Sequence, residues 1–316
     1  MRWFGKDAIA AAIDERAARD AVEMAFRQHS SRALQSIAVG HLHFDRPPGD
    51  FHVKGAHLTG RSTFTIKMAS SFYDNPAIGL PSSNGLMLVF DTNTGQPLGA
   101  LLDEGLLTDV RTAIAGGIAA RLIAPANTRT LGIVGTGTQA ALQARWVSRL
   151  LGSDAILIWG RNPERADDLA RNLRETGLST SIARTVEDLC ARSDVVVTTT
   201  PSTTPVIGVP CLRAGLRVVA VGADAAGKRE IAPEILAAAA IVLADSRAQC
   251  LAYGDCAGAG VDDRIIEIGE ALHQPFTPLA DTAVAVADLT GIGAQDAAIA
   301  EVVWHSLSER AAPQAG

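Results

Sequence analysis

The pattern of apolar and polar positions changes character along the chain. In the first thirty residues apolar side chains recur at helical spacing, as at Ile9 and Ile13, which predicts one or two helices with Asp14 as an N-cap between them. From residue 35 to about 102, short apolar runs are separated by turn residues, which is typical of an antiparallel sheet. Strands are predicted at residues 38–44, 51–56, 64–68, 85–90 and 96–101, with turns at 46–50, 74–76 and 92–95.

The pattern of apolar and polar positions changes again after a predicted helix at residues 108–124, which ends before Pro125. From Arg129 onward, short apolar strands alternate with helical stretches. Strands buried on both faces and joined by helices predict a parallel, doubly wound sheet. These strands are expected at residues 130–134, 155–159, 181–183, 194–200, 217–221 and 240–244.

The last predicted helix, residues 294–308, has an apolar face and is expected to pack back on the first domain. We therefore predict an α/β protein of two domains. One comprises residues 1–123 with 294–316, and the other is a Rossmann domain at residues 124–293.

The loop after residues 130–134 carries a phosphate-binding pattern, G-x-G-x-x-A, and leads directly into a helix. Gly135 permits a tight turn, Gly137 lets a pyrophosphate approach the backbone, and Ala140 keeps the helix close to its strand. This strand–loop–helix context favours a dinucleotide site over a turn that binds nothing. The predicted cofactor contacts here are Gly135, Thr136, Gly137, Thr138, Gln139 and Ala140.

The end of the second Rossmann strand bears on the choice of cofactor. An NAD site usually has an acidic residue there, whereas this chain has Arg161 and Asn162, with Arg165 close behind. A guanidinium suits a 2′-phosphate, so NADP(H) is favoured and NAD(H) remains possible. Thr199 and Thr200 end a further strand, where they either line the cofactor or simply terminate the strand.

Composition narrows the classes of function. The net charge is −6 with both signs mixed along the chain, which argues against a nucleic-acid partner. The four cysteines form no CxxC pair, and the seven histidines show no metal-binding spacing, so no metal site is expected. With no visible signal peptide and no apolar run of about 20 residues, we expect a soluble, cytoplasmic protein.

Three charged residues are candidates for meeting an anionic substrate. Lys67 lies among apolar neighbours in a predicted strand, Arg111 lies near a helix start, and Asp224 follows a Rossmann strand. A lysine in such a strand loses hydration unless it faces a cleft or a partner. Spacing alone leaves each of the three open between a surface salt bridge and a site residue.

Taken together, the motifs resemble those of the ornithine cyclodeaminase/μ-crystallin family over nearly the whole chain. The closest branch holds proteins described as ectoine-utilisation or alanine-dehydrogenase-like. The matching stretches are Ile66-Lys67, Gly79-Leu80-Pro81-Ser82, residues 107–113, the loop at 135–140, Gly222-Ala223-Asp224 with Gly227-Lys228, and Asp288-Leu289-Thr290-Gly291.

The resemblance implies a homodimer whose N-terminal α+β domain binds substrate and forms the dimer. It places the carboxylate-binding lysine at Lys67, a second carboxylate ligand at Arg111 and the catalytic aspartate at Asp224. It also assigns Thr112 and Gly222 to the cofactor site, and the stretch after the second Rossmann strand is similar to NADPH-using μ-crystallins.

Two positions depart from the family pattern. Lys54 stands where ornithine cyclodeaminase has a glutamate, which argues against a cationic substrate side chain. His43 lies near the place of an arginine that holds the carboxylate in several members, and it either replaces that arginine or is unrelated.

The resulting prediction is an NAD(P)H-dependent oxidoreductase of the C–N bond of a small α-amino or α-imino acid. Asp224, with a pKa raised by burial, is expected to exchange the proton at nitrogen, and Lys67 is the rival proton carrier. One alternative is an amino-acid cyclodeaminase that releases ammonia. Another is a non-catalytic NADPH-binding protein. A 2-hydroxy-acid dehydrogenase lacks support because no His–carboxylate pair follows the Rossmann strands.

Overall fold

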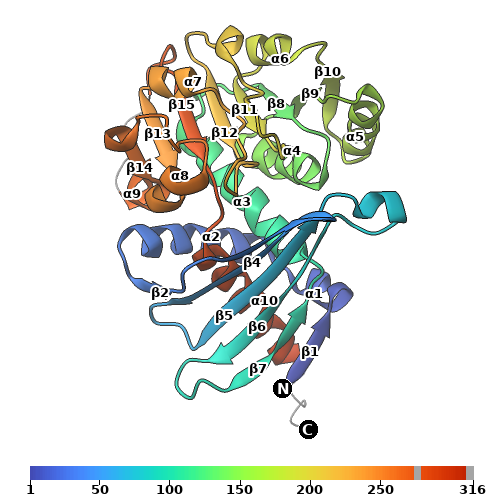
Figure 1. Ribbon diagram of the computed structural model, residues 1–316, viewed down its shortest axis with the longest axis vertical. Helices are drawn as coiled ribbons and strands as arrows, with labels where there is room; N and C mark the ends of the chain where they lie inside the picture. The colour runs from blue at the N-terminus through green and yellow to red at the C-terminus, as the bar shows by residue number, and fades with distance from the viewer. Residues whose placement is uncertain (274–278, 311–316) are drawn as a thin grey trace. The chain divides into compact units, whose positions relative to one another are not determined.

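The computed structural model describes residues 1–273 and 279–310 and divides into two compact units (Figure 1). Unit 1 comprises Met1–Arg111 with Ile292–Gly316, and unit 2 comprises Thr112–Gly291. The boundary falls inside α3 (Leu106–Ile123), whereas the sequence prediction placed it at the end of that helix.

Unit 1 is built on a mixed sheet with strand order β1-β7-β6-β5-β4-β2, and β3 also pairs with β4. Neighbouring strands are antiparallel except β1, which runs parallel to β7 and was not predicted. The strands are β1 (Arg2–Gly5), β2 (Leu34–Ser36), β3 (Gly40–Asp45), β4 (Pro48–Leu58), β5 (Thr63–Phe72), β6 (Ser83–Asp91) and β7 (Pro97–Leu102).

The turn predicted at residues 46–50 is wrong in extent. β4 already begins at Pro48, and His43 of β3 pairs with Asp50 of β4, so only Arg46 and Pro47 connect the strands. A proline is tolerated as the first residue of a strand, which is why the Pro48-Gly49 pair does not break the ladder. The turn predicted at residues 74–76 overlaps the short helix η1 (Asn75–Ile78).

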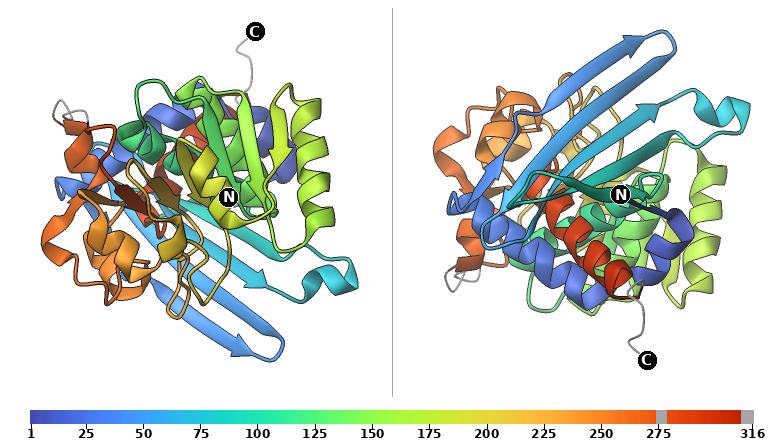
Figure 2. Two further views of the ribbon diagram at one scale, coloured as in Figure 1. Left: turned by 90° about the horizontal axis from the view of Figure 1, so that it is seen from above. Right: turned by 90° about the horizontal axis from the view of Figure 1, so that it is seen from below.

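Helices α1 (Lys6–Ala12), α2 (Glu15–Ser30) and α10 (Gly293–Arg310) lie on one face of this sheet (Figure 2). The predicted N-cap is confirmed, since the Asp14 carboxylate accepts a hydrogen bond from Ala17 N at 2.8 Å. α10 packs against α2, β4 and β5, and is therefore buried on most sides. This packing brings polar residues at the start of α10 close to the middle of the sheet.

Unit 2 is a doubly wound sheet whose neighbouring strands are parallel, in the order β10-β9-β8-β11-β12-β15-β13-β14. The predicted Rossmann fold class is thereby confirmed. β14 and β15 were not predicted, and β15 lies between β12 and β13. The strands are β8 (Thr130–Val134), β9 (Ala155–Trp159), β10 (Ser179–Ile182), β11 (Val195–Thr198), β12 (Arg217–Ala220), β13 (Ile241–Ala244), β14 (Ile265–Glu267) and β15 (Ala285–Asp288).

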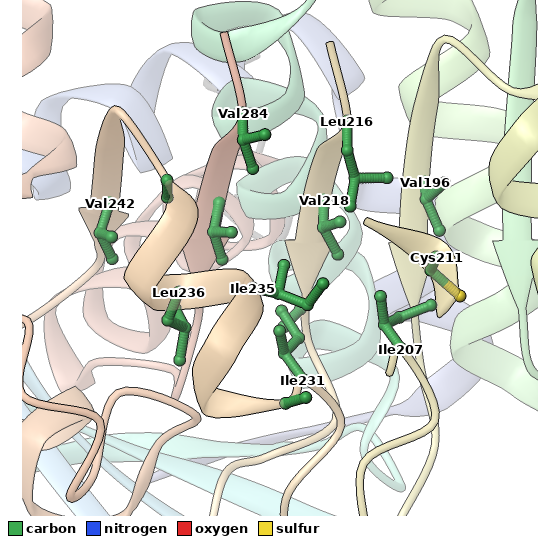
Figure 3. Close-up of a cluster of buried hydrophobic side chains, with 14 of the residues drawn as sticks. Val196, Ile207, Cys211, Leu216, Val218, Ile231, Ile235, Leu236, Val242 and Val284 are labelled. Carbon is green, nitrogen blue, oxygen red and sulfur yellow. The ribbon is translucent and has the colours of Figure 1, made fainter. Parts of the chain in front are cut away.

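The core of unit 2 is aliphatic, as the low aromatic content requires (Figure 3). Ile235 and Leu236 pack with Val196, Val218 and Val242 of the strands. The helices are α4 (Thr138–Leu151), α5 (Pro163–Glu175), α6 (Val186–Arg192), η2 (Val209–Cys211), α7 (Pro233–Ala238), α8 (Arg247–Tyr253), η3 (Asp262–Arg264) and α9 (Ile268–His273). Among the described residues, no helix is both long enough and apolar enough to cross a bilayer.

Candidate active site

Unit 1 buries three cationic side chains. Lys54 on β4 and Lys67 on β5 lie directly opposite each other in the ladder and are 6% and 3% exposed, and Arg111 on α3 is 5% exposed. Like charges at directly opposite positions destabilise a sheet, and burying them removes the water that would screen them. The fold therefore maintains this cluster, named here the cation cluster, against an electrostatic cost.

Asp296, in the first turn of α10, binds two members of the cation cluster. Its carboxylate lies 2.9 Å from Lys67 Nζ and accepts a hydrogen bond from Arg111 Nε at 2.9 Å. The neighbouring Gln295 Oε1 accepts from Arg111 Nη1 at 3.0 Å. The sequence reasoning missed Asp296, although an acidic residue inside an otherwise apolar helix start was a visible signal.

Burial and charge shape the protonation of this cluster. Burial lowers the pKa of Lys67 to about 7, since the attraction of Asp296 is opposed by Arg111 and Lys54. Burial acts to raise the pKa of Asp296, but the charges of Lys67, Arg111 and Lys54 outweigh it and the pKa is lowered. Burial also raises the pKa of nearby Asp103 to about 6.

The cation cluster places three positive charges close together. Lys54, Lys67 and Arg111 all act on the Asp296 carboxylate, and Lys67 acts on Asp103. Buried cations of this kind need paired charges or hydrogen bonds. An entering carboxylate has the charge and the hydrogen-bonding shape that arginine and lysine bind.

His43 is not brought to the cation cluster. Its side chain is 63% exposed, and Nδ1 lies 3.1 Å from the Asp50 carboxylate, whose hydrogen bonds and charge raise the pKa of His43. Asp50 also accepts from Tyr73 Oη at 2.7 Å. Lys54 lies four positions after Asp50 along β4, roughly 13 Å of strand. The proposed substitution of His43 for an arginine stays a prediction.

The glycine loop of unit 2 has the form that the sequence predicted. Gly135 has φ 127°, and a Cβ there would meet Thr199 Oγ1 at 2.4 Å, so only glycine fits. Gly137 is the N-cap of α4, and a Cβ there would have nothing within 4 Å. In the part of the chain that the structure describes, no side chain caps α4. Its first N–H groups therefore face an open loop suited to a phosphate.

The other predicted cofactor residues near the start of α4 have structural contacts of their own. Thr138 and Gln139 form the first turn of α4, and the buried Ala140 lets the helix pack closely. The methyl of Thr136 leaves no room for a Cβ at Gly160, at the end of β9. The backbone oxygen of Thr112 accepts from Gln143 Nε2 at 3.0 Å.

The end of β9 presents basic side chains to solvent. Arg161 is exposed, and Asn162 is the N-cap of α5, where its side-chain oxygen accepts from Arg165 N at 3.2 Å. Asn162 thus has a structural task besides its predicted cofactor contact. Arg165 is also exposed, in the first turn of α5.

The predicted cofactor residues after β11 are tied to the protein itself. Thr199 N and Oγ1 both donate to Val134 O, at 2.9 and 3.2 Å. Thr200 donates through its N–H and its hydroxyl to the buried Glu230 carboxylate, which the sequence reasoning missed. Their predicted contacts with the cofactor stay predictions.

Asp224 follows β12 in the loop between Gly222 and Glu230. Its side chain is 47% exposed, and its carboxylate is 2.6 Å from Lys228 Nζ. The side chain is therefore less buried than the sequence prediction requires, and it forms an ion pair with the Lys228 ammonium. An exposed, ion-paired carboxylate is suited to accept a proton and to pass it to water.

Unit 2 also buries four carboxylates, Glu230, Asp245, Asp255 and Asp288, each at most 1% exposed. Each accepts hydrogen bonds from backbone N–H groups, as Asp255 Oδ1 does from Glu230 N and Ile231 N at 2.7 and 2.8 Å. Burial is the largest cause of the raised pKa values of Asp288 (about 8), Glu230 (about 7) and Asp255 (about 6). The sequence reasoning did not single out these residues as a set.

A family model for ornithine cyclodeaminase/mu-crystallin proteins matches residues 7–311. The chain belongs to this family. An uncharacterized cyclodeaminase of Sinorhizobium fredii is 36% identical over 272 residues, covering 84% of this chain and 82% of the relative.

Two solved structures are similar over nearly the full length. An archaeal alanine dehydrogenase dimer with bound NAD has a TM-score of 0.88 and 30% identity, covering 98% of this chain and 96% of that one. The iminosuccinate reductase of Paracoccus denitrificans in complex with NAD+ has a TM-score of 0.85 and 27% identity, covering 98% and 97%. The family predicted from the motifs is therefore confirmed.

Proposed function

We propose that this protein is a nicotinamide-dependent oxidoreductase that reduces the C=N bond of a small α-imino acid or oxidises the corresponding amine. The observation that carries the proposal is the burial of Lys54, Lys67 and Arg111 in one cluster, in which the Asp296 carboxylate joins Lys67 and Arg111. The relatives named alanine dehydrogenase and iminosuccinate reductase confirm the predicted class of reaction. The substrate and the roles of single residues are the proposal.

Lys67 and Arg111 hold the substrate carboxylate, and Asp296 holds both cations in place from α10. Fixing an acid group at two points orients the α-carbon, and orientation alone can contribute several kcal/mol to a rate. Lys54 adds positive charge beside them and repels a substrate with a cationic side chain. We therefore propose a substrate with a neutral or acidic side chain.

Unit 2 holds the dinucleotide through the loop at Gly135–Ala140, whose open helix start matches a pyrophosphate. When bound, the nicotinamide ring supplies or takes up the hydride. Asp224 exchanges the proton at the substrate nitrogen, either directly or through water, and Lys228 forms an ion pair with it.

For the cofactor, we propose NADP(H) in preference to NAD(H). The support is the exposed Arg161 and Arg165 at the end of β9, where a carboxylate for the ribose 2′-hydroxyl would otherwise be expected. The two similar structures contain NAD, so the ratio of activities with NADPH and NADH is the direct measurement.

We further propose a homodimer formed through unit 1. Support comes from exposed apolar side chains, with Ile37 between β2 and β3 46% exposed and Leu42 on β3 57% exposed, and from the dimeric alanine dehydrogenase. Sedimentation of the purified protein at two concentrations tests this. A role in ectoine degradation and a cytoplasmic location stay predictions.

The function is tested by following NADPH and NADH oxidation against 2-oxo acids with ammonia or methylamine and against cyclic imino acids. We expect oxidation with one substrate class. Asp224→Asn should bind NADPH normally, as measured by nucleotide fluorescence, and should lower kcat by about 100-fold or more, a typical contribution of acid–base catalysis.

Two results would contradict this proposal. Wild-type turnover in Asp224→Asn would remove the role of that residue. No oxidation with any substrate, together with ammonia release from a diamino acid, would identify a cyclodeaminase, whereas cofactor binding with neither activity would identify a binding protein.

A further inference from the structure

The Glu230 carboxylate is fully buried and accepts four hydrogen bonds within the described structure. Oε1 accepts from Thr200 N at 2.5 Å and Thr200 Oγ1 at 2.7 Å. Oε2 accepts from Thr198 Oγ1 at 2.8 Å and Gly222 N at 2.6 Å. A carboxylate has about four acceptor sites, so these donors match its ionised form.

These donors come from the ends of two neighbouring strands. Thr198 ends β11 and Thr200 follows it, whereas Gly222 follows β12. In an open parallel sheet the carboxyl ends of the strands border the ligand site. Glu230 therefore ties together two segments of the edge where the sequence predicts cofactor and catalytic residues.

Glu230 also closes the loop that contains Asp224. Its side chain binds Gly222 N at the start of the loop, while its own backbone is fixed at the end of the loop. Its N–H donates to Asp255 Oδ1 at 2.7 Å, and its carbonyl accepts from Val206 N and Ile207 N at 2.8 and 2.9 Å. Glu230 thus connects the start of the loop at residue 222 with its end at residue 230.

Residue 222 is glycine because it lies very close to both Thr200 and Glu230. A Cβ at Gly222 would lie 2.1 Å from Thr200 O and 2.7 Å from Glu230 Oε2. Any larger residue would separate the two strand ends from Glu230. Gly222 was predicted to contact the cofactor, and in the structure it also allows Thr200 and Glu230 to lie close together.

We propose that Glu230 is a positioning residue for catalysis, which fixes the loop that presents Asp224 to the substrate nitrogen. The inference rests on the catalytic role proposed for Asp224. Glu230 itself is fully buried and is assigned no contact with substrate. It acts by holding Gly222 and Thr200 at fixed separation, so that Asp224 keeps one orientation between turnovers.

The test is Glu230→Gln, which keeps the size of the side chain but replaces one oxygen by an NH₂ group. The N–H of either Gly222 or Thr200 then faces a donor, and a backbone N–H cannot turn away. A displacement of about 1 Å at a reacting group can lower a rate about 100-fold, so we expect kcat to fall on the order of 10- to 100-fold.

Glu267→Gln is the matched control. Glu267 is also buried in unit 2, on β14, and one of its oxygens accepts a hydrogen bond from Arg247 N at 3.1 Å. The amide of a glutamine retains an oxygen for that bond. Glu267→Gln should therefore keep wild-type kcat, and thermal melting of both variants measures any general loss of stability.

A double-mutant cycle separates positioning from a general structural effect. If Glu230 acts through Asp224, then Glu230→Gln should cause no further loss of kcat in the Asp224→Asn background. A loss that multiplies with that of Asp224→Asn would overturn the inference, as would wild-type kcat in Glu230→Gln alone.

The same cycle distinguishes this inference from the proposed function. Full loss in Asp224→Asn with wild-type kcat in Glu230→Gln removes only the positioning role. Wild-type kcat in Asp224→Asn removes both. Should Glu230→Gln fail to fold, Thr198→Val removes one donor from the same carboxylate at constant size, and the expected result is a smaller loss that is again absent in Asp224→Asn.

Discussion

The two units bury charge in different ways. The cation cluster of unit 1 has two cations on facing strands and joins Lys67 and Arg111 through the Asp296 carboxylate, whereas four buried carboxylates of unit 2 accept hydrogen bonds from backbone N–H groups. Both arrangements lose hydration on folding. Charged side chains compensate for that loss in the cation cluster, and backbone donors do so around the carboxylates of unit 2.

The carboxylates of unit 2 replace missing backbone partners where loops meet strand ends, so they define the architecture. Under the proposed function, the cation cluster of unit 1 binds the substrate carboxylate, so it defines recognition. Removing a charge should therefore affect mainly stability in unit 2 and mainly substrate binding in unit 1.

The largest expected effect on stability is at Asp245. Its carboxylate accepts from Ser246 N at 2.8 Å, Thr290 N at 2.9 Å and Gly291 N at 2.6 Å. Asp245→Ala leaves these buried donors without an acceptor, so the free energy of unfolding should fall by about 3–4 kcal/mol. Urea denaturation measures this loss.

Asp263→Ala, at an exposed acidic residue of the same unit, is the control and should change stability by less than about 0.5 kcal/mol. Equal stability of the two variants would show that the buried carboxylates are not structural, and the comparison between the units would fail.

An effect of intermediate size is expected when pH is varied and the affinity for a carboxylate ligand is measured. The pKa of Lys67 is lowered to about 7 in the free protein, so above pH 7 the side chain is largely neutral. A bound carboxylate favours the ammonium form, and binding above pH 7 therefore takes up a proton. The affinity for an unreactive carboxylate such as propanoate should fall by up to about tenfold per pH unit between pH 7 and 9.

Asp103, whose pKa is about 6, titrates below this range. The inhibition constant of propanoate at several pH values measures the effect. Lys67→Arg is the comparison variant, because arginine remains charged throughout and should flatten the profile. A flat profile in the wild-type protein would show that Lys67 does not bind the carboxylate as an ammonium.

The smallest expected effect concerns substrate binding. Lys54→Met removes a buried positive charge that lies opposite Lys67, so KM for the substrate should increase modestly. Steady-state kinetics measure KM, and the melting temperature monitors the fold. Lys6→Met, at an exposed lysine paired with Glu104, should change neither. An unchanged KM in Lys54→Met would show that Lys54 does not contribute to substrate binding.

Local patterns were sufficient for much of the fold. The glycine loop, the strands around it and the Asp14 N-cap depend on neighbouring residues, and the structure has them where the sequence predicts them. Lys67 and Arg111 were proposed as separate candidates, and the structure joins them through Asp296. The family and the fold class are confirmed.

The features that the sequence did not predict depend on contacts between residues that lie far apart in the chain. Asp296 meets residues 185 and more positions away, and Glu230 meets the ends of two other strands. β15 is short and is inserted between strands that precede it in the chain. No periodicity within a window of ten to twenty residues encodes such partners, because partner choice is settled by topology.

The place of β15 and α10 in the fold has a consequence for biosynthesis. The ribosome releases the chain from its N-terminus, and residues 285–310 supply both an interior strand of the unit 2 sheet and the carboxylate of the cation cluster. Until they emerge, β12 and β13 have no strand between them and the three cations lack Asp296. A nascent chain therefore cannot complete either unit before residues 285–310 have been synthesised.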